Sequence, residues 1–318
     1  MSVEFCGLEL AAPVINGSGT FDAIAARRVF GDSLTDAFPF AAYVSKTITL
    51  QPRAGNPPPR LWETSSGLIN SIGLPNKGLH RYIEEDLPRI TGLRTRIGGE
   101  DERQAQPVPV ITNVMGSTAA ELSALVEACD ARPEIAAIEL NVSCPNVHTG
   151  LDIGADPRQL EAVVAEVRGH SAKPLIVKLT PNTADVALCA LAAQEAGADA
   201  VSLINTLRAM ALAPRPRSGV SGEAAAAASS KPWLGGRTGG LSGPAIRAVA
   251  LAQVAAVAAR VTIPVVGMGG VQNGVHAQEL LDVGAALVGV GTESFRDPAA
   301  GARIASELHA LCATSSPL

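Results

Sequence analysis

The sequence predicts a (β/α)8 barrel, in which parallel strands alternate with helices. Eight short segments rich in valine and isoleucine recur along the 318 residues, and alanine- and leucine-rich segments of helical length separate most of them. Parallel strands need helical crossovers, and eight units in one run favour closure of the sheet. An open, doubly wound sheet is the alternative. The predicted strands are residues 13–16, 42–45, 108–113, 137–142, 175–179, 200–205, 264–267 and 287–291.

The helical segments begin at recognisable capping residues. Thr118, Asp156 and Asp297 offer side-chain acceptors, and Pro157 and Pro298 suit the first turn of a helix. The predicted helices are residues 119–128, 158–167, 184–195, 245–259, 275–283 and 299–311.

Three segments depart from the alternation. Residues 3–10 are predicted to form a small hairpin that turns at Gly7 and plugs the barrel bottom. Residues 51–88 are an irregular stretch rich in proline, glycine and asparagine, which is unusual unless functional. Residues 214–231 contain an alanine run flanked by serines, and we interpret them as a mobile insertion or lid within a single domain of residues 1–318.

Composition excludes several functional classes. A net charge of -5 without a basic run argues against nucleic-acid binding through phosphate contacts. The five cysteines form no C-x-x-C pair and the histidines lack ligand spacing, so we expect no metal site. No signal peptide is visible at the start, and the apolar run 248–259 is too short to span a bilayer. We therefore expect a cytoplasmic protein that binds no membrane.

Polar residues or glycines follow almost every predicted strand. The active sites of such barrels lie at the C-terminal strand ends, and a purely structural barrel would not need so many polar residues there. The strand-end residues are Asn16 to Gly19, Ser45 to Thr47, Thr112 and Asn113, Asn141 to Cys144, Lys178, Asn205 and Thr206, Gly267 to Gly270, and Gly289 to Thr292.

The last two strand ends indicate a phosphorylated ligand. Glycines at 267–270 and 289–291 let backbone N–H groups approach a phosphate, although a glycine there often only permits a turn. Burying the ammonium of Lys46 or Lys178 inside a barrel mouth costs free energy unless an anion binds to it. The alternative is that each lysine extends to solvent at the rim.

Cys144 stands at the end of a buried apolar segment, among Asn141, Ser143 and Asn146. A free thiol has a pKa of about 8.5, which suits proton transfer near neutral pH if its surroundings help. The asparagines can hold a planar polar substrate without adding charge. The structural alternative is a small hydrophobic residue that fills a gap.

Several long motifs, in matching order over nearly the whole chain, resemble the dihydroorotate dehydrogenases. They are N-G-S-G-T-F at 16–21, S-K-T at 45–47, N-P-P-P-R at 56–60, N-S-I-G-L-P-N at 70–76, N-V-S-C-P-N at 141–146, N-T-L-R at 205–208, G-G-L-S-G-P-A at 239–245 and G-G-V at 269–271. The resemblance implies an FMN enzyme that oxidises (S)-dihydroorotate to orotate in pyrimidine (UMP) biosynthesis.

The resemblance also implies a role for each matching residue. Cys144 would be the base that removes the C5 proton while hydride leaves C6 for the flavin N5. The implied substrate-binding residues are Lys46, Asn70, Ser71, Ile72, Gly73, Leu74, Asn141, Asn205 and Thr206. The implied FMN-binding residues are Ser18, Lys46, Thr47, Asn113, Asn141, Lys178, Ile204, Gly243, Gly269, Gly270, Gly291 and Thr292.

The motifs resemble more than one branch of the family. With a cysteine at the position of the base, the chain resembles class 1 of the family. Residues 205–210 and 239–245 resemble the NAD-linked branch of that class. There the FMN subunit pairs with an electron-transfer subunit that carries FAD and an iron–sulfur cluster. Ser71 and Pro75 are instead similar to the fumarate-linked homodimeric branch. We therefore expect a homodimer, or a heterotetramer with such a subunit.

Three other functions fit parts of the pattern. A dihydropyrimidine dehydrogenase-like subunit would act on uracil or thymine. These substrates lack a carboxylate, so Lys46 would have no anionic group of the substrate to bind. A non-redox isomerase or aldolase would use the glycines for its own substrate phosphate. A catalytically silent homologue is disfavoured by the intact polar residues Lys46, Asn141, Cys144, Lys178 and Asn205.

Overall fold

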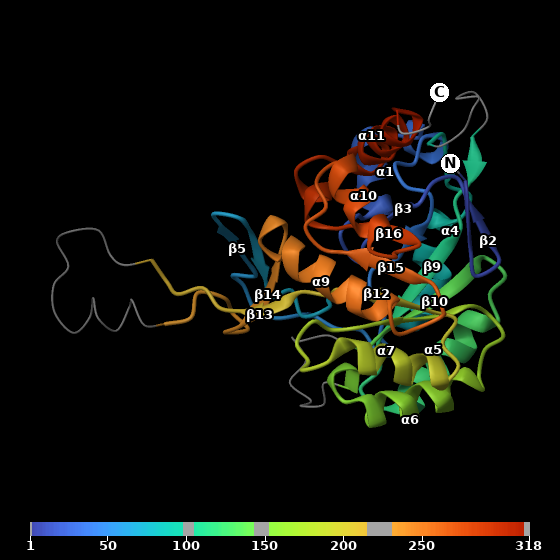
Figure 1. Ribbon diagram of the computed structural model, residues 1–318. Coiled ribbons are helices and arrows are strands. Elements are labelled where there is room, and N and C mark those ends of the chain that lie inside the picture. Colours follow the sequence, from blue (N-terminus) through green and yellow to red (C-terminus); the bar gives the residue numbers. More distant parts are fainter. Residues whose placement is uncertain (1, 98–104, 143–152, 215–230, 315–318) are drawn as a thin grey trace, which may run out of the picture.

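The computed structural model describes residues 2–97, 105–142, 153–214 and 231–314. Eight parallel strands form a nearly closed barrel with helices around it, as the sequence predicts (Figure 1). Each barrel strand overlaps one of the predicted segments. In spatial order they are β3 (Val14–Asn16), β16 (Leu287–Val290), β15 (Val265–Met268), β12 (Ala200–Leu203), β11 (Leu175–Lys178), β10 (Ile135–Asn141), β9 (Val110–Val114) and β4 (Tyr43–Val44).

All six predicted helices are present, and their caps act as expected. The side chain of Thr118 accepts a hydrogen bond from the Glu121 amide, and Asp156 accepts from Arg158. The helices are α5 (Ala119–Asp130), α6 (Pro157–Arg168), α7 (Val186–Glu195), α9 (Arg247–Ala258), α10 (Gly274–Asp282) and α11 (Ala300–Thr314). The helices α1 (Ala23–Phe30) and α2 (Ser33–Asp36), between β3 and β4, were not predicted.

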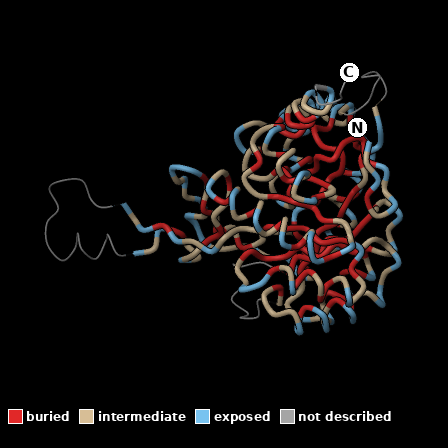
Figure 2. Tube along the Cα trace, viewed as in Figure 1, coloured by how far each residue is buried: buried red, intermediate tan, exposed pale blue. Residues whose placement is uncertain are grey.

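The N-terminal hairpin is present and lies at the bottom of the barrel. Strands β1 (Val3–Phe5) and β2 (Leu8–Leu10) pair across a turn in which Cys6 and Gly7 have positive φ. The Cys6 thiol contacts the carbonyl of Asp199, immediately before β12, and Phe5 and Leu10 are buried. The barrel interior is buried throughout (Figure 2).

A side chain closes the barrel between its first two strands in the chain, β3 and β4. The Asn16 amide donates to the Val44 carbonyl at 2.8 Å, and its oxygen accepts from the Val44 amide at 2.8 Å. One backbone hydrogen bond, from Ala41 to Val14 at 2.9 Å, lies beside them. Asn16 is completely buried, so its carboxamide takes the place that a strand ladder occupies elsewhere in the barrel.

The prediction of an irregular stretch at 51–88 was wrong for much of its length. It contains the hairpin β5 (Leu61–Thr64) and β6 (Gly67–Asn70), followed by α3 (Leu79–Arg81), the π-helical turn η1 (Tyr82–Asp86) and α4 (Leu87–Ile90). The two strands have few β-branched residues, and a distant strand stabilises them. Their local sequence therefore carries little strand signal.

That distant strand belongs to a second excursion from the barrel. Strands β13 (Leu207–Ala209) and β14 (Gly239–Ser242) join β6 and β5 in one antiparallel sheet of order β13-β14-β6-β5. Figure 1 shows β5, β13 and β14 beside the barrel. The predicted lid, residues 214–231, falls between β13 and β14, and its residues 215–230 lie outside the described part of the chain. A further short pair is β7 (Arg94–Thr95) and β8 (Gln106–Pro107).

Among the described residues, no helix combines the length and the apolar character that a bilayer span requires.

The closure at Asn16 predicts an unusually large loss of stability for one amide. Asn16→Ala leaves the amide and carbonyl of Val44 without partners in a buried place, which costs about 2–5 kcal/mol of unfolding free energy. Asn273→Ala is the matched control: Asn273 only caps α10 through the His276 amide, worth about 1 kcal/mol. Urea unfolding of the two variants measures both values. Equal losses would contradict a special role for Asn16.

Candidate active site

A cavity of about 570 Å³ opens at the C-terminal ends of the barrel strands. Its floor comes from the barrel, and part of its wall comes from the antiparallel sheet. The residues that line it are Gly17, Ser18, Gly19, Thr20, Lys46, Thr47, Leu61, Gly67, Leu68, Asn70, Ile72, Leu74, Asn141, Lys178, Ile204, Asn205, Thr206, Ser242, Gly243, Pro244, Ile246, Met268, Gly269, Gly270, Val271, Gln272, Gly291, Thr292, Glu293, Phe295 and Arg296.

The structure brings most of the sequence-predicted site residues together in this cavity. The predicted residues along its lining are Ser18, Lys46, Thr47, Asn70, Ile72, Leu74, Asn141, Lys178, Ile204, Asn205, Thr206, Gly243, Gly269, Gly270, Gly291 and Thr292. Ser71, Gly73 and Asn113 are described but do not line it. Cys144 lies outside the described residues.

Ser71 and Gly73 shape the loop that presents their neighbours. The buried Ser71 hydroxyl donates to the Thr238 carbonyl at 2.8 Å and accepts from the Asn56 amide at 3.0 Å. Gly73 has a φ of 74°, and a Cβ there would stand 2.5 Å from the Asn56 nitrogen. Only glycine fits so close an approach. The alternate residues Ile72 and Leu74 consequently face the cavity.

The two central strands of the antiparallel sheet approach each other closely through their backbones. β6 pairs with β14 in register, with Asn70 opposite Gly240 and Leu68 opposite Ser242. A Cβ on Gly67 would lie 2.1 Å from the Ser242 oxygen, so the pairing depends on the missing side chain. Asn70 also donates to the Gly240 carbonyl at 3.3 Å, which fixes the Asn70 carboxamide at the cavity wall.

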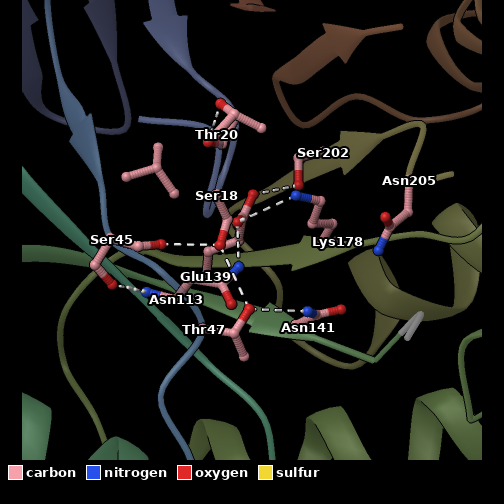
Figure 3. A network of polar contacts seen from close by, with 12 residues as sticks. Ser18, Thr20, Ser45, Thr47, Asn113, Glu139, Asn141, Lys178, Ser202 and Asn205 are labelled. Atoms are coloured by element: carbon pink, nitrogen blue, oxygen red, sulfur yellow. Dashed lines mark hydrogen bonds and ion pairs between the residues drawn. The ribbon is translucent and has the colours of Figure 1, made fainter. Parts of the chain in front are cut away.

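Polar side chains from neighbouring strands meet on one side of the cavity (Figure 3). Ser18 follows β3 and donates to the Ser45 carbonyl at 2.8 Å. Asn141 ends β10 and donates to the Thr47 hydroxyl at 3.1 Å. These contacts hold hydroxyl and amide groups in fixed positions without placing a charge among them.

A buried carboxylate below this layer was not predicted from the sequence. Glu139 is 3% exposed; its Oε1 accepts from the Ser202 hydroxyl at 2.6 Å, and its Oε2 accepts from the Asn113 amide. The Lys178 ammonium lies 3.9 Å from Oε2 (Figure 3). The available signal was a glutamate inside an aliphatic run, because an ionisable group there is costly unless it is paired.

Asn113 leaves one of its own atoms without a partner. Its side chain is completely buried, and its Oδ1 has no hydrogen-bond partner among the residues that the structure describes. Buried acceptors are nearly always satisfied in native proteins. The Asn113 Oδ1 atom therefore keeps the capacity to accept a further hydrogen bond.

Lys46 follows β4 and brings a positive charge to the cavity lining. The side chain is exposed, yet the protein around it partly desolvates the ammonium, which lowers the pKa of Lys46 below its ordinary value of 10.5. Asp22 raises this pKa and Arg60 lowers it, both by Coulomb interaction. An anion that enters the cavity would satisfy the ammonium.

Two glycines of the lining are not required by packing. A Cβ on Gly291 would meet only Thr20 Cγ2, at 3.6 Å, and one on Gly17 would meet nothing closer than 3.6 Å. Gly269 differs, since it has a φ of 138° and its Cβ would lie 2.7 Å from Ala250 Cβ. The open space at Gly291 is therefore available to a ligand rather than to the protein.

A model of the family "Dihydroorotate dehydrogenase" matches residues 1–312. This chain belongs to that family. Similar curated proteins of the family include the dihydroorotate dehydrogenase B (NAD(+)) catalytic subunits of Geobacter sulfurreducens, 41% identical over 312 residues, and Citrifermentans bemidjiense, 43% identical over 309 residues. The corresponding subunit of Geobacter metallireducens is 41% identical over 318 residues. Each alignment covers 97% of this chain and 92% of the relative.

Dihydroorotate dehydrogenases are oxidoreductases that use a flavin, so family membership assigns this chain to the flavoenzymes. The match runs through both excursions that build the antiparallel sheet as well as through the barrel. Among the described residues, no group of three or more His, Cys, Asp or Glu side chains is arranged to hold a metal ion.

Proposed function

We propose that this protein oxidises (S)-dihydroorotate to orotate in pyrimidine biosynthesis, with FMN as its cofactor. The supporting observation is the meeting of Lys46 with Asn70, Asn141 and Asn205 in one cavity that also carries the strand-end glycines. A lysine beside several neutral amides suits a ring that has one carboxylate and several amide groups. Family membership supports the same reaction.

The cavity fits a flavin mononucleotide on three counts. Its volume of about 570 Å³ is in the usual range for small-molecule sites. Gly291 leaves open space, and the buried Asn113 oxygen lacks a donor among the described residues. The residues that would hold FMN are Ser18, Lys46, Thr47, Asn113, Asn141, Lys178, Ile204, Gly243, Gly269, Gly270, Gly291 and Thr292. When bound, FMN supplies the two-electron acceptor for the hydride that leaves C6 of the substrate.

Other side chains of the cavity would bind and orient the substrate. The Lys46 ammonium would take the carboxylate, and the carboxamides of Asn70, Asn141 and Asn205 would satisfy the amide edge of the ring. Ile72 and Leu74 would cover the ring and exclude water. Lys178 would stabilise the negative charge that the cofactor gains.

Cys144 would be the general base that takes the proton from C5. Its position is known from the sequence only: it stands three residues after Asn141, which ends β10 at the cavity. A thiol ionises near neutral pH much more readily than a hydroxyl, so a cysteine at this position would supply a base there.

The names of the related proteins support a partner subunit. They are catalytic subunits of NAD(+) enzymes. We propose that this chain works in the cytoplasm and forms a homodimer, which assembles into a heterotetramer with an electron-transfer subunit carrying FAD and an iron–sulfur cluster. Fumarate reduction by the homodimer alone is the competing assignment.

Anaerobic reduction tests the proposed reaction and the role of Cys144 together. We expect dihydroorotate to bleach the flavin absorbance of the purified chain in a single turnover, whereas dihydrouracil leaves it oxidised. Cys144→Ala should retain FMN but bleach about 100- to 10,000-fold more slowly, the usual worth of a positioned base. Cys144→Ser should shift the pH optimum of bleaching upwards, because a hydroxyl loses its proton less readily than a thiol.

The outcomes separate the alternatives. A preference for dihydrouracil would transfer the protein to the dihydropyrimidine dehydrogenases, and a colourless protein that takes up no FMN would refute the flavoenzyme proposal. Unchanged bleaching by Cys144→Ala would remove Cys144 from the mechanism. Reoxidation of the bleached protein by fumarate would assign the homodimeric branch.

The lowered pKa of Lys46 predicts that orotate binds more weakly at alkaline pH. The carboxylate favours the ammonium form, so affinity is complete below the ligand-free pKa and falls as pH rises through it. Because that pKa lies below 10.5, the loss begins at a lower pH than for an ordinary lysine. Orotate titrations that follow the flavin absorbance between about pH 7 and pH 10 measure the effect.

Two variants at the same position control this measurement. Lys46→Gln should bind orotate about 10- to 100-fold more weakly, with no decline through this range. Lys46→Arg should show little decline, since a guanidinium keeps its charge. An alkaline loss that persists in Lys46→Gln would contradict the assignment to Lys46.

The open space at Gly291 predicts a variant that separates FMN binding from stability. Gly291→Ala should change the urea stability of the cofactor-free protein by less than about 1 kcal/mol, because the added methyl meets only a methyl at 3.6 Å. The same methyl should weaken FMN binding by at least about tenfold. Gly269→Ala is the contrast, since its strained backbone and its contact with Ala250 should cost about 1–3 kcal/mol of stability. Wild-type FMN affinity in Gly291→Ala would refute the prediction.

A further inference from the structure

The buried carboxylate of Glu139 connects four neighbouring barrel strands. It extends from β10 and accepts hydrogen bonds from Asn113 on β9 and Ser202 on β12, and it pairs with Lys178 on β11 (Figure 3). Both carboxylate oxygens act as acceptors, which is the arrangement that suits the ionised group. The geometry therefore places a fixed negative charge inside the barrel.

Glu139 is near the cavity but does not line it. Asn141, two residues further along the same strand, does line it, and residues two apart on a strand point to the same face. The Glu139 carboxylate is thus one layer below the floor. A buried ion pair can often be replaced by apolar residues without loss of stability, so the fold alone does not explain this pair.

Lys178 belongs to both layers. Its side chain is only 7% exposed and lines the cavity, while its ammonium lies 3.9 Å from Glu139 Oε2. That distance is too long for a hydrogen bond, so the Lys178 ammonium does not donate a hydrogen bond to the Glu139 carboxylate. Across the described ranges, no other carboxylate oxygen lies within 4 Å of this ammonium.

We propose that Glu139 is a positioning residue that acts on the bound flavin through Lys178. It keeps a counter-charge behind the ammonium and so limits how strongly Lys178 stabilises negative charge on the cofactor. The inference rests on the proposed FMN site. It adds that the electron affinity of the flavin is set by the Glu139–Lys178 pair, and that Glu139 touches neither the cofactor nor the substrate.

Sulfite is a suitable probe because it binds oxidised flavins as an anion and needs neither substrate nor turnover. Its affinity follows the electrostatic potential at the ring. Glu139→Gln removes one charge and keeps two polar atoms for Asn113 and Ser202. At about pH 6, we expect this variant of the FMN-loaded protein to bind sulfite about tenfold more tightly than wild type.

A double-mutant comparison tests whether the effect passes through Lys178. In Lys178→Met, Glu139 has no ammonium through which to act. Replacing Glu139 with Gln in that background should therefore change the sulfite dissociation constant by no more than about twofold. Ser202→Ala, which keeps the charge pair, should also stay within about twofold of wild type.

Each outcome decides between the possibilities. An unchanged or weakened sulfite affinity in Glu139→Gln, or an equal gain in both backgrounds, would overturn the proposal. If Glu139→Gln does not fold, Glu139→Asp withdraws the charge by one methylene, and a smaller gain of the same sign is expected. A wild-type protein that binds no flavin would refute the proposed function as well. Sulfite binding that is normal in wild type and insensitive to Glu139 would refute only the present inference.

Discussion

The antiparallel pairing of β6 with β14 is the interaction on which the cavity depends. The two strands come from excursions 170 residues apart in the chain, and the Ser242 hydroxyl on β14 accepts a hydrogen bond at 2.8 Å from Thr292, just after β16. The pairing brings Asn70 and Leu68 to face the floor built by the barrel strands. Without it the strand ends would form an open surface, and a flat substrate ring would have one wall instead of two.

The polar floor is possible because the barrel supplies a rigid register. Parallel neighbours place Asn113 opposite Glu139 and Lys178 opposite Ser202, so donors, acceptors and charges meet without adjustment. Desolvation of two opposite charges is costly, and only fixed geometry with further hydrogen bonds offsets it. The apolar residues that surround this layer keep water out, which strengthens every interaction within it.

The sequence was most informative where the structure is most regular. The eight barrel strands are runs of buried aliphatic residues, so their pattern alone located them. The hairpin β5–β6 was missed, because its stability comes from β14 and not from its own residues. Glu139 was missed because a single glutamate does not disturb the apolar pattern of β10. Ser71 and Gly73 were placed in the predicted site, but their neighbours face the cavity, and a motif cannot say which of its members point inward.

The closure of the barrel by Asn16 gives the ring a seam. Elsewhere in the barrel, consecutive backbone hydrogen bonds join neighbouring strands. At the seam, the Asn16 carboxamide and one backbone hydrogen bond join β3 to β4 and the residues before it. Ser18 and Lys46 lie on opposite sides of it, directly after β3 and β4. Because the Val44 amide donates to the Asn16 side chain, its exchange with solvent reports on the opening of the barrel between β3 and β4, next to Ser18 and Lys46 of the cavity lining.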